Sequence, residues 1–148
     1  MVKSVRKSLV PVVPEARPAR IGDTEKLTIN LGVVDLGQID LLVQEGFYSN
    51  RTDLIRTAIR NQLTVHADHV ERTVARRTLL LGLQHFSRAD LERALAAGQM
   101  LHIQVVGLAR IAQDVTPELA RATIESVVVL GAFHASPAVR RALADRIS

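Results

Sequence analysis

Three polar residues, Lys26, Thr28 and Asn30, alternate with apolar residues in the segment 26–31. Strict alternation is typical of a half-buried β-strand, which places these three side chains on one face and their apolar neighbours on the other. On an exposed strand their polar groups could pair with the base edges of a duplex. Lysine favours guanine, asparagine can pair bidentately with adenine, and threonine suits either. The polar face therefore suggests recognition of nucleic acid.

The residues that follow this strand predict two helices. Apolar residues recur at helical spacing between positions 36 and 63. We expect Gly46 at the C′ position after the first helix, where a left-handed backbone favours glycine. We expect Asn50 to cap the second helix, with Asp53 reaching back from N3 to complete a capping box. Since no breaker intervenes, this helix is predicted to continue to about residue 68.

One short strand with a single apolar face is not stable by itself. We therefore expect two copies of the chain to pair their strands antiparallel across a two-fold axis. The apolar faces would then pack onto the four helices of an intertwined dimer. The opposite face would form a two-stranded polar ribbon, which fits the major groove of B-DNA.

This segment resembles the ribbon-helix-helix family of Arc-, MetJ- and CopG-type repressors, whose ribbons enter the major groove. The resemblance rests on the strand KLTINL, the turn formed by residues 46–48, and the second-helix opening SNRTDLIRTAIR. It implies a homodimer that binds double-stranded DNA, without a cofactor, as a sequence-specific transcriptional repressor. The helix N-terminus would bind a phosphate through free N–H groups and the helix dipole. The implied contacts are Lys26, Thr28 and Asn30 to bases, and Ser49, Asn50 and Arg51 to phosphates.

Two glycines depart from the family pattern. Gly32 replaces the polar residue or proline that is common after the strand. Gly37 lies inside the first predicted helix and weakens it by about 1 kcal/mol relative to alanine. Both departures count against the match to the family.

Composition excludes several classes of protein. The chain contains no cysteine, which excludes disulfides, cysteine–zinc sites and thiol catalysis and fits a reducing cytoplasm. No apolar run approaches the about 18 residues that span a bilayer, and prolines interrupt the apolar stretch 9–13, so we expect neither a membrane span nor a signal peptide. The net charge of +4 permits DNA binding, although the charges of residues 26–65 balance. Residues 1–25 are predicted to form a flexible basic arm that either follows DNA or stays solvated.

Beyond residue 68 the sequence suggests three strand-plus-helix repeats. Three glycines, 25 and 24 residues apart, each close a short β-prone run. A loop then leads to a helix opened by a serine or threonine cap, with proline at N1 in the last two repeats. This pattern predicts a small solenoid, with a plain α/β domain as the alternative. The glycines are Gly82, Gly107 and Gly131, and the caps are Ser87, Thr116 and Ser136.

The histidines raise the question of a metal sensor. His85 and His134 share a repeat position, and Arg110 holds that position in the middle repeat. A basic residue in register is better explained by solvation or hydrogen bonding than by metal ligation, and no thiolate is present. We also find no serine–histidine–aspartate pattern and no glycine-rich phosphate loop. We therefore expect no metal site, no catalytic residue and no enzyme activity.

The predicted fold class is α+β, with a ribbon-helix-helix domain over residues 26–68 and a strand-helix repeat domain over residues 69–148. We expect a cytoplasmic DNA-binding regulator that forms homodimers. Open sheet edges of the second domain would assemble higher oligomers or receive a protein partner. Two alternatives remain: an antitoxin or plasmid-partition protein whose second domain binds a partner, and a self-assembling structural protein.

Overall fold

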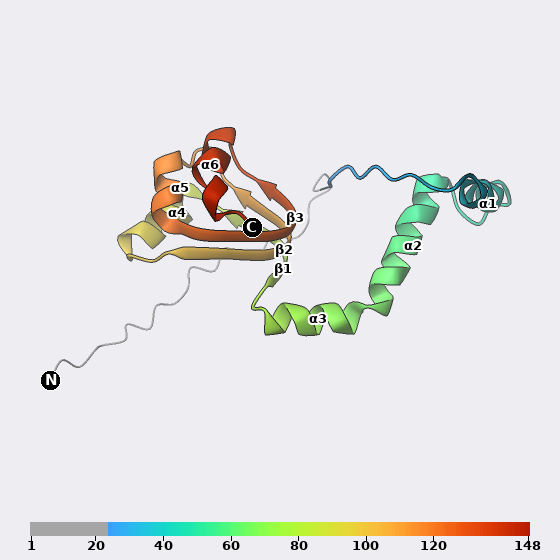
Figure 1. The fold of residues 1–148 in the computed structure, drawn as a ribbon, viewed down its shortest axis with the longest axis horizontal. Helices are drawn as coiled ribbons and strands as arrows, with labels where there is room; N and C mark the ends of the chain where they lie inside the picture. Colours follow the sequence, from blue (N-terminus) through green and yellow to red (C-terminus); the bar gives the residue numbers. More distant parts are fainter. Residues whose placement is uncertain (1–23) are drawn as a thin grey trace. The chain divides into compact units, whose positions relative to one another are not determined.

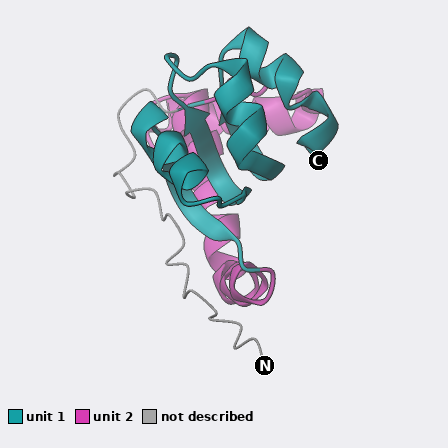
Figure 2. Ribbon diagram, turned by 90° about the vertical axis from the view of Figure 1, so that its left-hand side faces the viewer, with its two compact units in different colours: residues 1–24, 78–148 teal, residues 25–77 magenta. Residues whose placement is uncertain are grey.

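The computed structural model describes residues 24–148. Within this range the chain forms two compact units, residues 25–77 and residues 78–148 (Figure 2). The predicted basic arm, residues 1–25, lies outside the described residues except for its last two.

The N-terminal unit begins with an extended segment and continues with three helices (Figure 1). These are α1 (Val33–Gln44), α2 (Arg51–Val65) and α3 (Ala67–Arg76). Helix α1 ends in a Schellman motif, in which Gly46 has φ +84° and its N–H donates to the carbonyl of Val43 at 3.1 Å. Phe47 donates to the carbonyl of Leu42 at 3.0 Å. The predicted C′ glycine is therefore confirmed.

The second helix is shorter than predicted. It ends at Val65, and α3 starts at Ala67 after a break at His66. The hydroxyl of Thr64 donates to the carbonyl of Arg60 at 2.9 Å, a back-bond that bends helices. The N–H of His66 then bonds the carbonyl of Leu63 rather than the one a full turn back. Since α3 belongs to the N-terminal compact unit, we place the boundary of our proposed domains after residue 77.

The C-terminal unit alternates strands and helices around a parallel sheet (Figure 1). The strands are β1 (Leu80–Phe86), β2 (Leu101–Ile111) and β3 (Ile124–His134), in the spatial order β1-β2-β3. Between and after them lie α4 (Arg88–Ala96), α5 (Pro117–Thr123), α6 (Pro137–Ala142) and the short 3₁₀ helix η1 (Ala144–Arg146). The mixed helix and strand class is confirmed, and the solenoid-like arrangement stays a prediction.

An aliphatic core joins the helices to one face of this sheet. Ile103 and Val105 of β2 are buried together with Leu91 of α4, Ala120 of α5 and Val139 of α6. Alternate residues of a strand point to opposite faces, so the three helices cover the face that carries Ile103 and Val105. The opposite face carries the exposed side chains of Leu81 and Leu130.

The three capping residues predicted for the second unit are confirmed. The side chains of Ser87, Thr116 and Ser136 each accept a hydrogen bond, at 3.2 Å, from the backbone N–H three residues on. In α4 the carboxylate of Asp90 also accepts from the N–H of Ser87 at 2.8 Å, which completes a capping box. These local contacts fix where each helix begins.

The three glycines stand in the middle of the strands, and the prediction that they close them was wrong. Gly82, Gly107 and Gly131 lie in register across the sheet, with φ values of +127°, +135° and +127°. Glycine alone adopts this mirror-image extended backbone readily, so each strand continues beyond it. A Cβ on Gly107 would overlap the carbonyl oxygen of Gly82, and one on Gly131 would overlap that of Gly107. The glycine column therefore permits a close approach of the strands.

Candidate nucleic-acid interface

The segment 26–31 is extended and exposed in the single chain. Its polar residues Lys26, Thr28 and Asn30 are all exposed. The apolar residues between them are exposed as well, with 77% of Leu27 and 50% of Ile29 open to solvent. The segment has no strand partner among the described residues, so it is not assigned as a strand.

The N-terminus of α2 has the predicted cap with one difference. The side-chain oxygen of Asn50 accepts from the N–H of Asp53 at 2.9 Å, as predicted. The carboxylate of Asp53 accepts from the N–H of Ser49 at 3.1 Å, not from that of Asn50 as a capping box requires. Asn50 has φ −165°, whereas Ser87, which forms a true capping box, has φ −79°. This rotation turns the N–H of Asn50 away from Asp53 and places that of Ser49 within reach.

Arg51 forms an ion pair that the sequence did not reveal. Its Nε and Nη2 donate to the two carboxylate oxygens of Asp40 in α1, both at 2.7 Å. This contact joins α1 to the first turn of α2, and both side chains remain about half exposed. The hydrogen bond from Arg51 lowers the pKa of Asp40, and the same contact raises the pKa of Arg51. The carboxylate of Asp40 thus binds the guanidinium of Arg51, which we predicted to bind a phosphate.

The structure therefore brings together Ser49, Asn50 and Arg51 at the N-terminus of α2. The candidates for base contacts, Lys26, Thr28 and Asn30, lie on the separate segment 26–31. The N–H groups of Arg51 and Thr52 lie in the first turn, where a helix supplies no acceptor for them. These N–H groups and the helix dipole favour an anion. The carboxylates of Asp40 and Asp53 oppose it, so any phosphate there competes with two acidic groups.

Apolar side chains are left uncovered throughout the N-terminal unit. None of the residues of α1, α2 or α3 is buried. Phe47 is 72% exposed, and Leu63 is 60% exposed. Where exposed apolar side chains form a contiguous patch, they mark an interface in soluble proteins. The unit thus lacks a hydrophobic core of its own within one chain.

The model of the ribbon-helix-helix transcriptional regulator family matches residues 22–140. The match covers most of the chain, so this protein belongs to that family, and the resemblance inferred from the sequence is confirmed. Membership implies DNA binding and, usually, dimers. No curated protein and no solved structure matches the chain.

Other chemistry finds little support in the described residues. They contain no group of three or more histidine and acidic side chains placed to hold a metal ion. No helix among them is both long and apolar enough to cross a membrane.

His102 contacts the hydroxyl of Ser126 at 2.9 Å and the carboxylate of Glu125 at 3.4 Å. His102 and Glu125 are more than half exposed, so we interpret this chain of contacts as a solvated surface pair between β2 and β3 and assign it no catalytic role.

Proposed function

We propose that this protein is a sequence-specific transcriptional regulator whose homodimer inserts an antiparallel ribbon of two 26–31 segments into the major groove. Lys26, Thr28 and Asn30 contact base edges, and Ser49, Asn50 and Arg51 contact the flanking phosphates. Base contacts then set the sequence preference, and phosphate contacts set the position of the ribbon. The protein acts in the cytoplasm without a cofactor.

The observation that carries this proposal is the uncovered apolar face of the ribbon segment. Leu27 and Ile29 alternate with the polar residues and are half or more exposed in the single chain. Pairing with a second copy would cover this face against the helices and leave the polar face outward. Family membership supports the same arrangement.

Selection of bound fragments from random DNA, followed by gel shifts on the selected site, tests the proposal. Asn30→Ala should lower the preference for the selected site by about 1–3 kcal/mol, because it removes a bidentate base contact. Its binding to unrelated DNA should stay unchanged. Gln113→Ala, an exposed polar residue of the C-terminal unit, is the matched control. An unaltered preference in Asn30→Ala would show that the segment faces away from the bases.

The C-terminal unit favours a role in assembly. Its parallel sheet has an edge strand, β1, that a further strand could join, and we propose that this solenoid-like unit links copies of the regulator or holds a protein partner. An antitoxin or plasmid-partition protein would use the same unit for its partner. Co-purification of a second small protein from the native host would favour that alternative.

A further inference from the structure

The two edges of the C-terminal sheet differ. The outer edge of β3 is covered at its start by residues 147 and 148, because the N–H of Ser148 donates to the carbonyl of Val127 at 2.9 Å. Further along the same edge a guanidinium N–H of Arg140 in α6 donates to the carbonyl of Phe133. Carbonyls that already accept hydrogen bonds are poor sites for a further strand. The β3 edge is therefore blunted.

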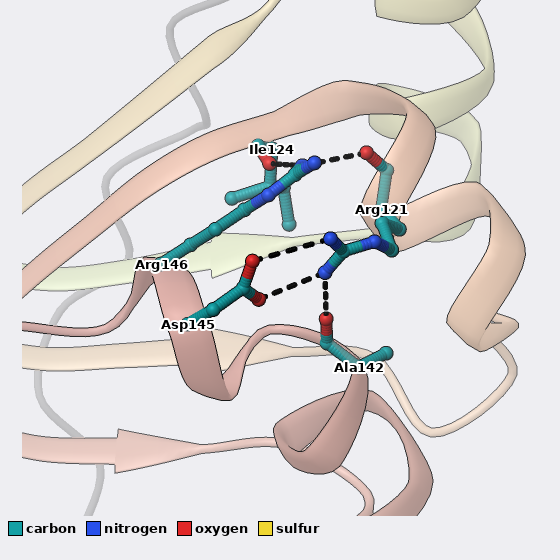
Figure 3. Close-up of polar contacts among 5 residues, drawn as sticks. All are labelled: Arg121, Ile124, Ala142, Asp145 and Arg146. Atoms are coloured by element: carbon teal, nitrogen blue, oxygen red, sulfur yellow. Dashed lines mark hydrogen bonds and ion pairs between the residues drawn. The ribbon is translucent and has the colours of Figure 1, made fainter.

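Two arginines hold the turn formed by η1 and the residues after it against the start of β3 (Figure 3). Arg146 of η1 donates to the carbonyl of Arg121 at 2.7 Å and to that of Ile124. Arg121 donates to the carbonyl of Ala142 at 2.6 Å and pairs with Asp145 at 2.8 and 3.2 Å. The hydrogen bond from Arg121 lowers the pKa of Asp145. The turn is thus held by several contacts at once.

The edge formed by β1 is different. Among the described residues, the only strand that pairs with β1 is β2. The carbonyl of Gly82 faces Gly107, so Gly82 directs its backbone groups inward. In a parallel ladder alternate residues bond to the same side, so Leu81 and Leu83 direct theirs outward. Leu81 is 64% exposed, and the space where Gly82 would carry a Cβ is empty.

We propose that β1 pairs antiparallel with β1 of a second copy, across a two-fold axis perpendicular to the sheet. The two sheets then join into one with the strand order β3-β2-β1-β1-β2-β3, and all the helices lie on one face of it. Head-to-tail addition of β1 onto β3 is opposed by the contacts that already occupy the β3 edge, which leaves the self-complementary contact between two β1 strands. This inference does not rest on DNA binding.

The absence of cysteine from the chain allows a direct test in the full-length protein. Single variants Leu81→Cys and Leu83→Cys report on the β1 edge. Leu130→Cys is the matched control, because Leu130 lies in the same row of the sheet as Leu81, on β3, and is 53% exposed. With a short bis-maleimide, both β1 variants should form covalent dimers at least about tenfold faster than the control, since pairing raises the effective thiol concentration.

Leu81→Pro in the Leu83→Cys background supplies a second measurement. Proline at an outward-facing edge position keeps the ladder with β2 but removes a donor from the edge. The cross-linking rate should fall to that of the Leu130→Cys control, while circular dichroism should stay unchanged. Equal rates at all three positions, or the fastest rate at Leu130, would overturn the proposal, as would edge pairing with a foreign protein instead of a second copy.

Gel shifts on the same variants separate this inference from the proposed function. DNA binding without β1 cross-linking would refute the edge pairing alone. Cross-linking without sequence-selective DNA binding would refute the ribbon proposal alone and would support the edge pairing.

Discussion

At the scale of single residues, two anions compete for Arg51: the carboxylate of Asp40 and, in the proposed complex, a DNA phosphate. Its guanidinium is held by Asp40 in the free chain, and we propose that it contacts a phosphate in the complex. Arg51→Ala should therefore weaken binding to all sequences alike and reduce the slope of log K against log salt by about 0.9, the value for one phosphate. Fluorescence anisotropy over a salt series measures this, with Arg76→Ala as the control for a general loss of charge. A selective loss at the preferred site would contradict the phosphate role.

Asp40 should have the opposite effect if the ion pair competes with DNA. Asp40→Asn removes the charge that holds Arg51 and repels phosphate, so affinity for every sequence should rise. The same anisotropy series measures the change. Weaker binding, similar to that of Arg51→Ala, would instead show that Asp40 positions the arginine for DNA.

At the scale of elements, the glycine column controls the stability of the sheet. Gly107→Ala forces a Cβ onto the carbonyl of Gly82 and strains a backbone with φ +135°, so we expect a loss of about 3–5 kcal/mol in the free energy of unfolding. Gly82→Ala has open space and suffers only the backbone strain, about 1–3 kcal/mol. Urea unfolding of both variants gives the comparison. Equal losses would show that overlap between strands contributes nothing.

What the sequence predicted well at this scale is local chemistry. Gly46, Asn50 and the caps of the second unit act through neighbours a few residues away, so their types and spacing suffice. Position within a strand depends on partners far along the chain. For this reason we predicted Gly107 at a strand end, whereas the strand continues through the buried residues that follow it. The Asp40–Arg51 pair likewise depends on how two helices meet.

At the scale of the whole molecule, stability should depend on chain concentration. The N-terminal unit buries no helix residue in one chain, so in the proposed homodimer its folded state would gain most of its burial from the second copy. The melting temperature, followed by circular dichroism, should rise as the chain concentration rises. Ile29→Lys, which places a charge on the apolar face of the ribbon segment, should lower the melting temperature at every concentration. A melting temperature independent of concentration would mean that the unit is stable alone.

The uncovered leucines and phenylalanine of the N-terminal unit also have a cellular consequence. When the chain is scarce, we expect solitary copies to expose these side chains to proteases and chaperones and to be removed faster than the paired copies of the proposed homodimer. The supply of competent regulator should therefore grow more steeply than the rate of synthesis. A modest change in expression would then act on its promoters almost as a threshold.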